Sequence, residues 1–397
     1  NLKFYNIIVQ ILSFIQFYIP GFKSGGPVRS LSNIVKLQNN DFKFSIYTSD
    51  RDFSDSAKYP GIKCEDWNFS PLQRIYYSSA SISSVIFFLI KEHNIHYDIL
   101  YLNSFFSFRF SIIPIIYFYL FKPKTKILIA PRGEFSEGAL RLKYIKKKIF
   151  IFLSKNFYEK LNISWHSTSK LESQELLKVI KKDSVNSVIP SLYTVPNLTD
   201  LTFKRYDSSL TLKTALRITF ISRVNAKKNL LFALELLSNI DLNIEFTIIG
   251  PIDDLNYWNE CKRIIRKLPN NISVVTKKPI PHAQIIKEFS KYDLFLFPTL
   301  GENFGHVILE SLFAGTSVIV GEKVPWPNCE NRTLTKLELD IKVWKKFLHR
   351  WYDAYKRNFM EFRNNANKYA TNNLSSKEDM LLTKNMFNSV FSQKIRH

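Results

Sequence analysis

Cysteine and glycine are scarce in this chain of 397 residues, which contains 3 Cys and 11 Gly. Cys64, Cys261 and Cys329 lie far apart and form no C-x-x-C pair, which excludes a disulfide scaffold and a zinc ribbon and favours a reducing compartment. So little glycine, together with only 16 prolines, excludes collagen-like and linker-type sequences. The predicted location is the cytoplasm.

Acidic residues are also few, since 34 Asp and Glu stand against 56 Lys and Arg and leave a net charge of +22. The first 200 residues carry 26 basic and 15 acidic residues, and the rest carry 30 and 19. The excess therefore covers whole faces of the protein and does not sit in a basic tail. It favours phosphate-rich partners, namely nucleic acid, anionic lipid or nucleotide substrates, without choosing among them.

Long apolar runs are missing as well. The longest candidate, residues 99–121, is interrupted by Asn103, Arg109 and Pro114, whereas a membrane-spanning helix needs about 20 largely apolar residues. We expect no spanning helix.

Short apolar runs alternate with helical patterns throughout the chain. Most of these runs are continuous, which is typical of parallel strands buried on both faces of a sheet. The predicted strands are 7–12, 44–48, 98–102, 126–130, 163–166, 185–189, 217–221, 244–249, 272–275, 293–298 and 317–320. This pattern predicts an α/β fold with two Rossmann-like, doubly wound domains that face each other across a cleft, followed by C-terminal helices.

The boundary between the two copies is expected at Val195-Pro196-Asn197. The sequence thus predicts an N-terminal domain over 1–197, a second domain over 198–335, and helices over 336–397 that pack back across both. Aromatic residues spaced by three and four in that last segment, such as Trp344, Phe347 and Trp351, indicate one buried helix face.

The segment 297–315 carries the strongest motif, FPTLGENFGHVILESLFAG. A strand should end near Pro298 and a helix should begin near Gly305. The backbone amides of that helix start have no partner within the helix, and the helix dipole adds positive potential, so the loop can bind a phosphate.

Two glutamates flank this phosphate position. Glu310 should lie about 7.5 Å behind the helix start, where a ribose would follow a diphosphate, and a carboxylate can accept hydrogen bonds from a diol. Glu302 lies on the other side, where a sugar on the diphosphate would sit. The alternative for either acid alone is a solvated side chain.

Basic residues and glycines follow three further predicted strands. Arg223 and Lys228 lie in a loop that opens a helix at Asn229, and could neutralise a diphosphate; a solvated basic loop is the alternative. Gly25 and Gly26 precede a helix and permit close approach of a ligand; ordinary turn glycines are the alternative.

Residue Arg132, in Ala130-Pro131-Arg132-Gly133, should point into the cleft, or else belong to a tight surface turn. Downstream, residues 138–161 combine lysines with aromatic and aliphatic residues. Such a basic helix suits an anionic membrane surface, although a solvated face over a core stripe is the commoner case.

With these residues in place, the chain resembles retaining glycosyltransferases of the GT-B fold, family four, also called group 1. The resemblance covers nearly the whole chain. The family includes bacterial capsule and lipopolysaccharide enzymes. Glu302 and Glu310 match the family's pair of glutamates, and Arg223 and Lys228 match its diphosphate motif. The stretches 48–52, 59–62, 131–133 and 324–326 resemble a subgroup of polysaccharide-biosynthesis enzymes, although no mechanism follows from them.

The resemblance implies roles for individual residues. Arg223 and Lys228 would hold the donor diphosphate, Glu310 would bind the donor ribose, and Glu302 would contact the donor sugar near the reacting carbon. Backbone amides of the loop and the first-domain glycines would complete the donor site; these residues are Asn303, Phe304, Gly305, Gly25 and Gly26.

The implied reaction moves a sugar from a nucleotide diphosphate to a hydroxyl of a glycan or lipid-linked acceptor, with retention of configuration, in surface polysaccharide biosynthesis. The leaving diphosphate can serve as the base. No cofactor, metal or nucleic-acid partner is expected, and the implied location includes peripheral attachment at the inner face of the cell membrane.

The chain departs from the family pattern at one position: many relatives have His-Gly where this chain has Arg132-Gly133. Arginine cannot act as a base near neutral pH, so Arg132 would stabilise developing charge or bind an anionic acceptor. The donor base, the sugar, the acceptor, the linkage and the oligomeric state stay open. The alternatives are another GT-B enzyme, such as a sugar-nucleotide epimerase, and a non-catalytic basic binder of membrane or nucleic acid.

Overall fold

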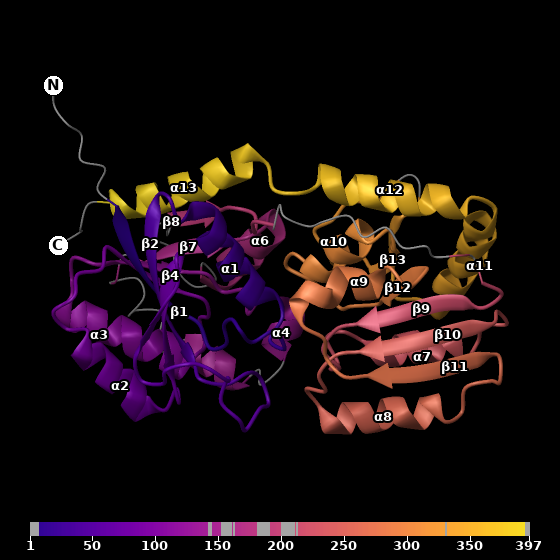
Figure 1. Cartoon of the computed structure of the whole chain (residues 1–397), viewed down its shortest axis with the longest axis horizontal. Helices are drawn as coiled ribbons and strands as arrows, with labels where there is room; N and C mark the ends of the chain where they lie inside the picture. The colour runs from indigo at the N-terminus through magenta and orange to yellow at the C-terminus, as the bar shows by residue number, and fades with distance from the viewer. Residues whose placement is uncertain are drawn as a thin grey trace. The chain divides into compact units, whose positions relative to one another are not determined.

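The computed structural model describes residues 8–141, 145–151, 161, 163–180, 191–199, 211, 213–329 and 332–393. The chain divides into two compact units, each built on its own sheet (Figure 1). Unit 1 comprises Asn1–Thr199 and Ser375–His397, and unit 2 comprises Asp200–Leu374. The α/β prediction with two doubly wound sheets is confirmed.

Unit 1 has an eight-stranded sheet in the order β3-β4-β2-β1-β5-β6-β7-β8. All neighbours are parallel except β3, which runs antiparallel to β4. The strands are β1 (Val9–Phe14), β2 (Phe42–Ser49), β3 (Trp67–Phe69), β4 (Gln73–Ser78), β5 (Ile99–Leu102), β6 (Lys126–Ile129), β7 (Ser164–Ser167) and β8 (Ser191–Thr194). Its helices are α1 (Gly26–Gln38), α2 (Ile82–Lys91), the π-helix η1 (Phe108–Ile112), α3 (Ile113–Phe121), α4 (Glu137–Arg141), α6 (Lys170–Ile180) and α13 (Lys377–Phe391).

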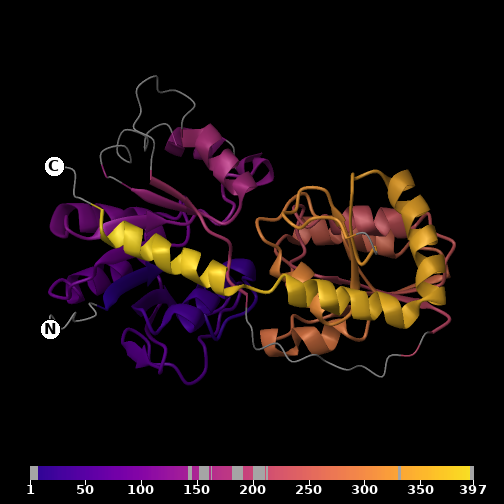
Figure 2. The same cartoon turned by 90° about the horizontal axis from the view of Figure 1, so that it is seen from above.

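Helices cover both faces of this sheet, because successive strand residues point to opposite sides. Ile11 on β1 packs in a cluster with residues of α1 and α13, whereas its neighbour Leu12 packs in a second cluster with residues of α2 and α3. The continuous apolar strands of the sequence are explained by this burial on both faces. Figure 2 shows α13 lying along unit 1, where Phe387 contacts the rings of Phe42 and Phe44.

Unit 2 has a six-stranded parallel sheet in the order β11-β10-β9-β12-β13-β14. The strands are β9 (Leu216–Ile221), β10 (Ile244–Ile249), β11 (Ile272–Lys277), β12 (Leu294–Phe297), β13 (Ser317–Gly321) and β14 (Leu334–Leu337). The helices are α7 (Leu230–Leu237), α8 (Leu255–Ile265), the 3-10 helix η2 (His282–Gln284), α9 (Ile285–Phe289), α10 (His306–Phe313), α11 (Ile341–Arg357) and α12 (Phe359–Asn372). One core holds this unit together, and the aromatic face predicted for α11 is part of it, with Trp344 and Trp351 buried.

The units divide after Thr199 and again after Leu374, whereas the sequence placed boundaries after 197 and 335. The predicted C-terminal segment 336–397 is shared between the units: α11 and α12 complete the core of unit 2, and α13 completes one face of unit 1. Within the described part of the chain, none of the helices combines the length and the apolar character that a membrane crossing requires.

Candidate functional site

The strand order of unit 2 reverses between β9 and β12, which lie side by side at the centre of the sheet. In open parallel sheets, ligands bind outside the carboxyl ends of the strands at such a reversal. The loop after β9 carries Arg223 and Lys228, and the loop after β12 carries Glu302. The predicted residues therefore lie at the place that the topology favours.

Lys228 and Glu302 are in direct contact, with Nζ and Oε1 2.5 Å apart and both side chains largely buried. The hydroxyl of Thr299 donates a second hydrogen bond to the same Oε1 at 2.9 Å. Burial opposes ionisation of Glu302, but the Lys228 and Lys227 ammonium groups hold the pKa of this carboxyl below its usual value. Burial also lowers the pKa of Lys228, against the opposing pull of Glu302. The two residues form a charged pair at the sheet edge.

The glutamate loop is fixed by the segment that follows β13. The Glu302 backbone N–H donates to the carbonyl of Lys323 at 2.9 Å. The Trp326 indole N–H donates to the carbonyl of Phe304, and the two rings pack 4.9 Å apart. Trp326, in the stretch 324–326 that suggested no mechanism from the sequence alone, thus holds the glutamate loop in place at Phe304.

Helix α10 begins directly after Gly305, as the sequence predicts. Gly305 has φ 77°, a left-handed conformation, and a Cβ there would lie 2.9 Å from Ile308 Cδ1. Only glycine fits both conditions. Because glycine has no side chain with which to cap the helix, the first amides of α10 remain suited to an anionic ligand.

Glu310 is buried on α10, where the imidazole Nε2 of His282 lies 3.3 Å from its Oε1. His282 begins the short helix η2 after β11, so it approaches from the same edge of the sheet. Sequence reasoning missed His282. The prolines at 279 and 281 mark this strand-end loop, and they were the available signal.

Arg223 lies beside this pair but has a different partner. Its side chain is about one-third exposed, and NH1 lies 3.2 Å from Asp253 Oδ2. Asn225 donates to the same carboxylate oxygen at 2.8 Å. Arg223 is still close enough to contribute to the lowered pKa of Lys228. Asp253, which the sequence gave no reason to select, keeps this guanidinium at the strand end.

Arg132 in unit 1 occupies a strained backbone position, with φ 54° at the end of β6. Such left-handed conformations are uncommon outside glycine and persist only where the surroundings hold them. Here the Gly133 N–H donates to the buried carboxylate of Glu172 at 2.7 Å. The predicted tight turn is present, and Glu172 holds it.

The guanidinium of Arg132 donates to neutral oxygens only in its described hydrogen bonds. These are Asn103 Oδ1 at 2.8 Å, Asn197 Oδ1 at 2.9 Å and the Tyr101 hydroxyl at 2.8 Å. The Tyr101 hydroxyl lies 2.8 Å from His166 Nδ1, and His166 Nε2 lies 3.0 Å from the carbonyl of Val195. A carbonyl can only accept, so Nε2 carries a proton. At neutral pH the lowered pKa of His166 leaves the imidazole uncharged, so Nδ1 accepts the Tyr101 proton.

Burial, with the Arg132 charge nearby, lowers the pKa of His166 to about 3. The described hydrogen bonds of the Arg132 cation, at the strand ends of unit 1, thus go to neutral groups.

Gly25 and Gly26 lie in the loop after β1 and at the start of α1. Gly25 has φ 77°, which favours glycine, whereas a Cβ at Gly26 would meet no atom within 4 Å. The carboxylate of Asp52 holds this loop, because it accepts from the N–H groups of Phe22 and Lys23 at 2.8 and 3.1 Å. A Cβ at Gly21 would lie 2.2 Å from the Tyr59 hydroxyl. Two stretches of unexplained sequence, 48–52 and 59–62, therefore shape the glycine loop.

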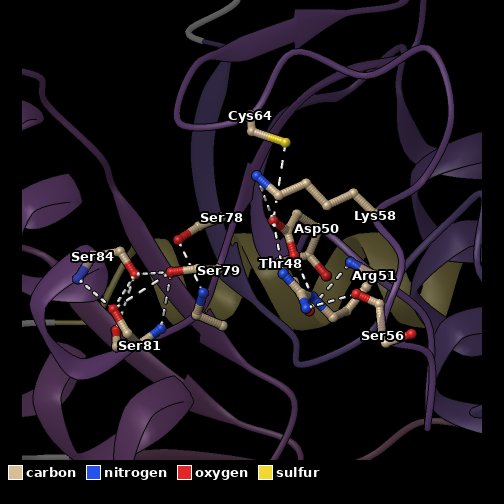
Figure 3. A network of polar contacts seen from close by, with 12 residues as sticks. Thr48, Asp50, Arg51, Ser56, Lys58, Cys64, Ser78, Ser79, Ser81 and Ser84 are labelled. Atoms are coloured by element: carbon tan, nitrogen blue, oxygen red, sulfur yellow. Dashed lines mark hydrogen bonds and ion pairs between the residues drawn. The ribbon is translucent and has the colours of Figure 1, made fainter.

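Asp50 is the buried centre of a polar network at the end of β2 (Figure 3). Arg51 Nε donates to its Oδ1 at 2.8 Å, and Lys58 Nζ lies 3.3 Å from its Oδ2. The Cys64 thiol lies 4.0 Å from the same Oδ2. With two cations beside one buried carboxylate, the network anchors the loop between β2 and β3.

The predicted membrane helix 138–161 lies partly outside the described residues, at 142–144 and 152–160. In the helical stretch 145–151, Lys147 donates to the carbonyl of Ala139 at 2.6 Å and lies over the ring of Phe106. Within the described ranges, no cluster of three or more His, Cys, Asp or Glu side chains is arranged to hold a metal ion.

Comparison with known protein families finds a match over part of the chain. Residues 204–372, which span most of unit 2, match the family described as glycosyl transferases group 1. The sequence finds no match among curated proteins.

Solved structures share the fold over nearly the whole chain. Sucrose-phosphate synthase from Thermosynechococcus elongatus is 14% identical with a TM-score of 0.74, covering 97% of this chain and 99% of that one. Anabaena Alr3699/HepE in complex with UDP-glucose is 13% identical with a TM-score of 0.67, covering 96% and 99%. WaaG, a glycosyltransferase involved in lipopolysaccharide biosynthesis, is 11% identical with a TM-score of 0.65, covering 96% and 100%.

Proposed function

We propose that this chain is a glycosyltransferase. Its residues 204–372 match glycosyl transferases group 1, and it shares its fold with solved glycosyltransferases. It would transfer a sugar from a nucleotide-diphosphate donor to a hydroxyl of a glycan or lipid-linked acceptor. The donor diphosphate would lie between Arg223, Lys228 and the first amides of α10. The ribose would reach Glu310, and the donor sugar would reach Glu302. Gly25 and Gly26 would contribute the open backbone of unit 1.

The contact between Lys228 and Glu302 carries this proposal. In a nucleotide sugar the second phosphate is bonded directly to the anomeric carbon. A cation that binds the diphosphate and an acid that binds the sugar must therefore be neighbours. The 2.5 Å contact between Nζ and Oε1 meets that requirement, at the point where the strand order reverses.

The charge state of the pair favours a mechanism without a side-chain base. Glu302 has a lowered pKa and is ionised at neutral pH, so it would stabilise positive charge on the sugar ring and would not donate a proton. As the bond from the anomeric carbon to the diphosphate breaks, Lys228 and Arg223 would stabilise the leaving oxygens. The acceptor oxygen bonds to the same face, its proton passes to a phosphate oxygen, and configuration is retained. Because these side chains supply the positive charge, we expect activity to persist in a metal chelator.

The structural relatives support the substrate class and the setting. HepE is solved with UDP-glucose, and WaaG takes part in lipopolysaccharide biosynthesis. We accordingly propose a nucleotide-sugar donor and a role in surface polysaccharide biosynthesis at the cytoplasmic side of the cell.

The test is donor turnover without added acceptor, using UDP-, GDP- and ADP-glucose. Release of one nucleoside diphosphate, with the first sugar product in the donor's anomeric configuration by proton NMR, is expected for the wild type. Glu302→Gln should abolish it. An epimerised donor would instead identify an epimerase, and no reaction or binding with any donor would favour a non-catalytic basic protein.

A further inference from the structure

The outer sides of α2 and α3 expose large apolar side chains. Ile86, Phe87 and Ile90 on α2 and Ile116, Leu120 and Phe121 on α3 are each 40–63% exposed. We call these six residues the apolar face. The two helices are in contact, and the His93 ring just beyond α2 packs against Tyr117 and Phe121 of α3. Helices α2 and α3 lie side by side in unit 1 (Figure 1), so the six residues are carried by two adjacent helices.

The opposite sides of both helices pack into the hydrophobic core of unit 1. Val85, Phe88 and Leu89 of α2 and Ile115 and Phe118 of α3 are buried against the sheet. A helix at a protein surface normally has an apolar stripe on one side and polar residues on the other, whereas a helix that is apolar all round is normally covered all round. Helix α3 contains no charged residue over Ile113–Phe121. Its outer side has the composition of a covered surface.

Lysines frame this face where the helices end. Lys91 closes α2, and Lys122 and Lys124 follow α3; Lys91 and Lys124 are exposed and Lys122 is half-buried. Of the two acids between residues 82 and 126, Glu92 is buried against Trp67 and Tyr97, and Asp98 is bound by the backbone N–H of Gln10. Asp66 is an exposed acid directly before β3, and its Oδ1 lies 3.8 Å from Lys91 Nζ. Lys91 is thus paired with an acid, and Lys122 and Lys124 supply the positive charge beside the apolar face.

We infer that the apolar face is a docking surface for an anionic phospholipid bilayer. The apolar side chains would enter the boundary between headgroups and acyl chains, and the lysines, with long aliphatic stems, would reach the anionic headgroups. The lysines favour a bilayer over a second apolar protein surface as the occupant, because lysine is depleted at protein interfaces. The surface differs from the basic stretch 138–161 selected from the sequence.

The test is flotation of the full-length protein with vesicles. One set is pure phosphatidylcholine, and the other contains equal parts of phosphatidylcholine and phosphatidylglycerol. The protein should float with the anionic vesicles and much less with the neutral ones. High salt should weaken the binding, because it screens the lysines.

Two variants separate the apolar and the electrostatic contributions. Phe87→Asn/Leu120→Asn should lower the partition coefficient at least about tenfold on anionic vesicles, since two large side chains that would enter the bilayer are lost. Lys122→Glu/Lys124→Glu should lower anionic binding and leave neutral binding unchanged. The matched control is Leu255→Asn/Leu381→Asn, which removes two similarly exposed leucines from α8 and α13 and should bind as the wild type does.

Thermal melts and nucleotide titrations of each variant keep this inference apart from the proposed function. Unchanged melting and nucleotide binding, with lost flotation, would support the docking surface. Wild-type flotation by Phe87→Asn/Leu120→Asn would overturn it. So would a wild type that floats with neither vesicle, including one whose apolar face instead mediates self-association in sedimentation experiments.

Discussion

Lys228 in unit 2 and Arg132 in unit 1 are both cations at the carboxyl end of a central strand, yet their surroundings differ. Lys228 is paired with Glu302, so its charge is balanced inside the protein. Arg132 donates instead to the neutral groups Asn103, Asn197 and Tyr101, and the nearby carboxylate of Glu172 accepts from the Gly133 N–H. A cation paired with an acid can exchange that acid for an anionic ligand, as we propose for Lys228. Neutral hydrogen-bond acceptors instead fix the orientation of the Arg132 side chain.

Lys228→Met should give the largest change, because it leaves the Glu302 carboxylate buried without its ion partner. Removing one member of a buried pair costs about 3–5 kcal/mol, whereas replacing both with apolar residues is often close to neutral. The unfolding free energy of unit 2 should fall accordingly in Lys228→Met and largely recover in Lys228→Met/Glu302→Leu. Urea denaturation, with hydrogen exchange to assign the transition, measures this difference. A double variant no more stable than the single one would show that the pair is not coupled as described.

Arg132→Ala should destabilise unit 1 by a smaller amount. It leaves the acceptor oxygens of Asn103 and Asn197 without their donor, at roughly 1–3 kcal/mol. The control is Arg109→Ala, which removes a hydrogen bond to the carbonyl of Ala80 and should cost less. Equal losses in the two variants, measured by urea denaturation, would argue against a network built around Arg132.

The buried His166 beside Arg132 also predicts that the stability of unit 1 depends on pH. Burial lowers the pKa of His166 from 6.5 to about 3, so between those values the unfolded state binds a proton that the folded state does not. Stability should therefore fall as the pH drops from about 6.5 toward 3, by up to about 1.4 kcal/mol per pH unit. Denaturation midpoints against pH for the wild type and His166→Gln measure this, and an unchanged slope in the variant would exclude His166 as its source.

Arg223→Gln should have the smallest effect on stability, below about 1 kcal/mol, because its pair with Asp253 is partly exposed. Nucleotide-diphosphate affinity should nevertheless fall roughly tenfold, since a charged donor to phosphate is lost. Arg266→Gln, an exposed arginine after α8, serves as the control in the same titration. Equal affinities in the two variants would remove Arg223 from the site.

Much of the architecture follows from apolar periodicity. Strand β10 was predicted over 244–249 and is found there, and β9, β12 and β13 agree to within a residue at each end. Strand β4 was missed because its polar start and tyrosines give no apolar run, and the short strands β3 and β14 depend on pairing with neighbours. The predicted strand 185–189 lies outside the described residues, just before β8.

The sequence predicted only the part of the site that lies within one continuous segment. The spacing from Glu302 to Glu310 is local, but the contact of Glu302 with Lys228 joins residues 74 positions apart and depends on the strand order. Asp52 lies in a loop and His282 at the start of η2, and their partners lie in the loop after β1 and on α10, distant in the sequence. Such contacts require the register and order of the sheet, which no single sequence pattern specifies.

The most direct measurement is isothermal titration calorimetry of UDP, GDP and ADP into the wild type, Glu310→Ala and the control Glu288→Gln. Glu310 and Glu288 are both buried in unit 2, on the neighbouring helices α10 and α9. One nucleotide should bind the wild type and the control, and Glu310→Ala should lose about 1.5–3 kcal/mol of binding free energy, the range for hydrogen bonds to a charged group. Equal binding by all three proteins, or no binding by the wild type, would contradict a donor site at the strand ends of unit 2.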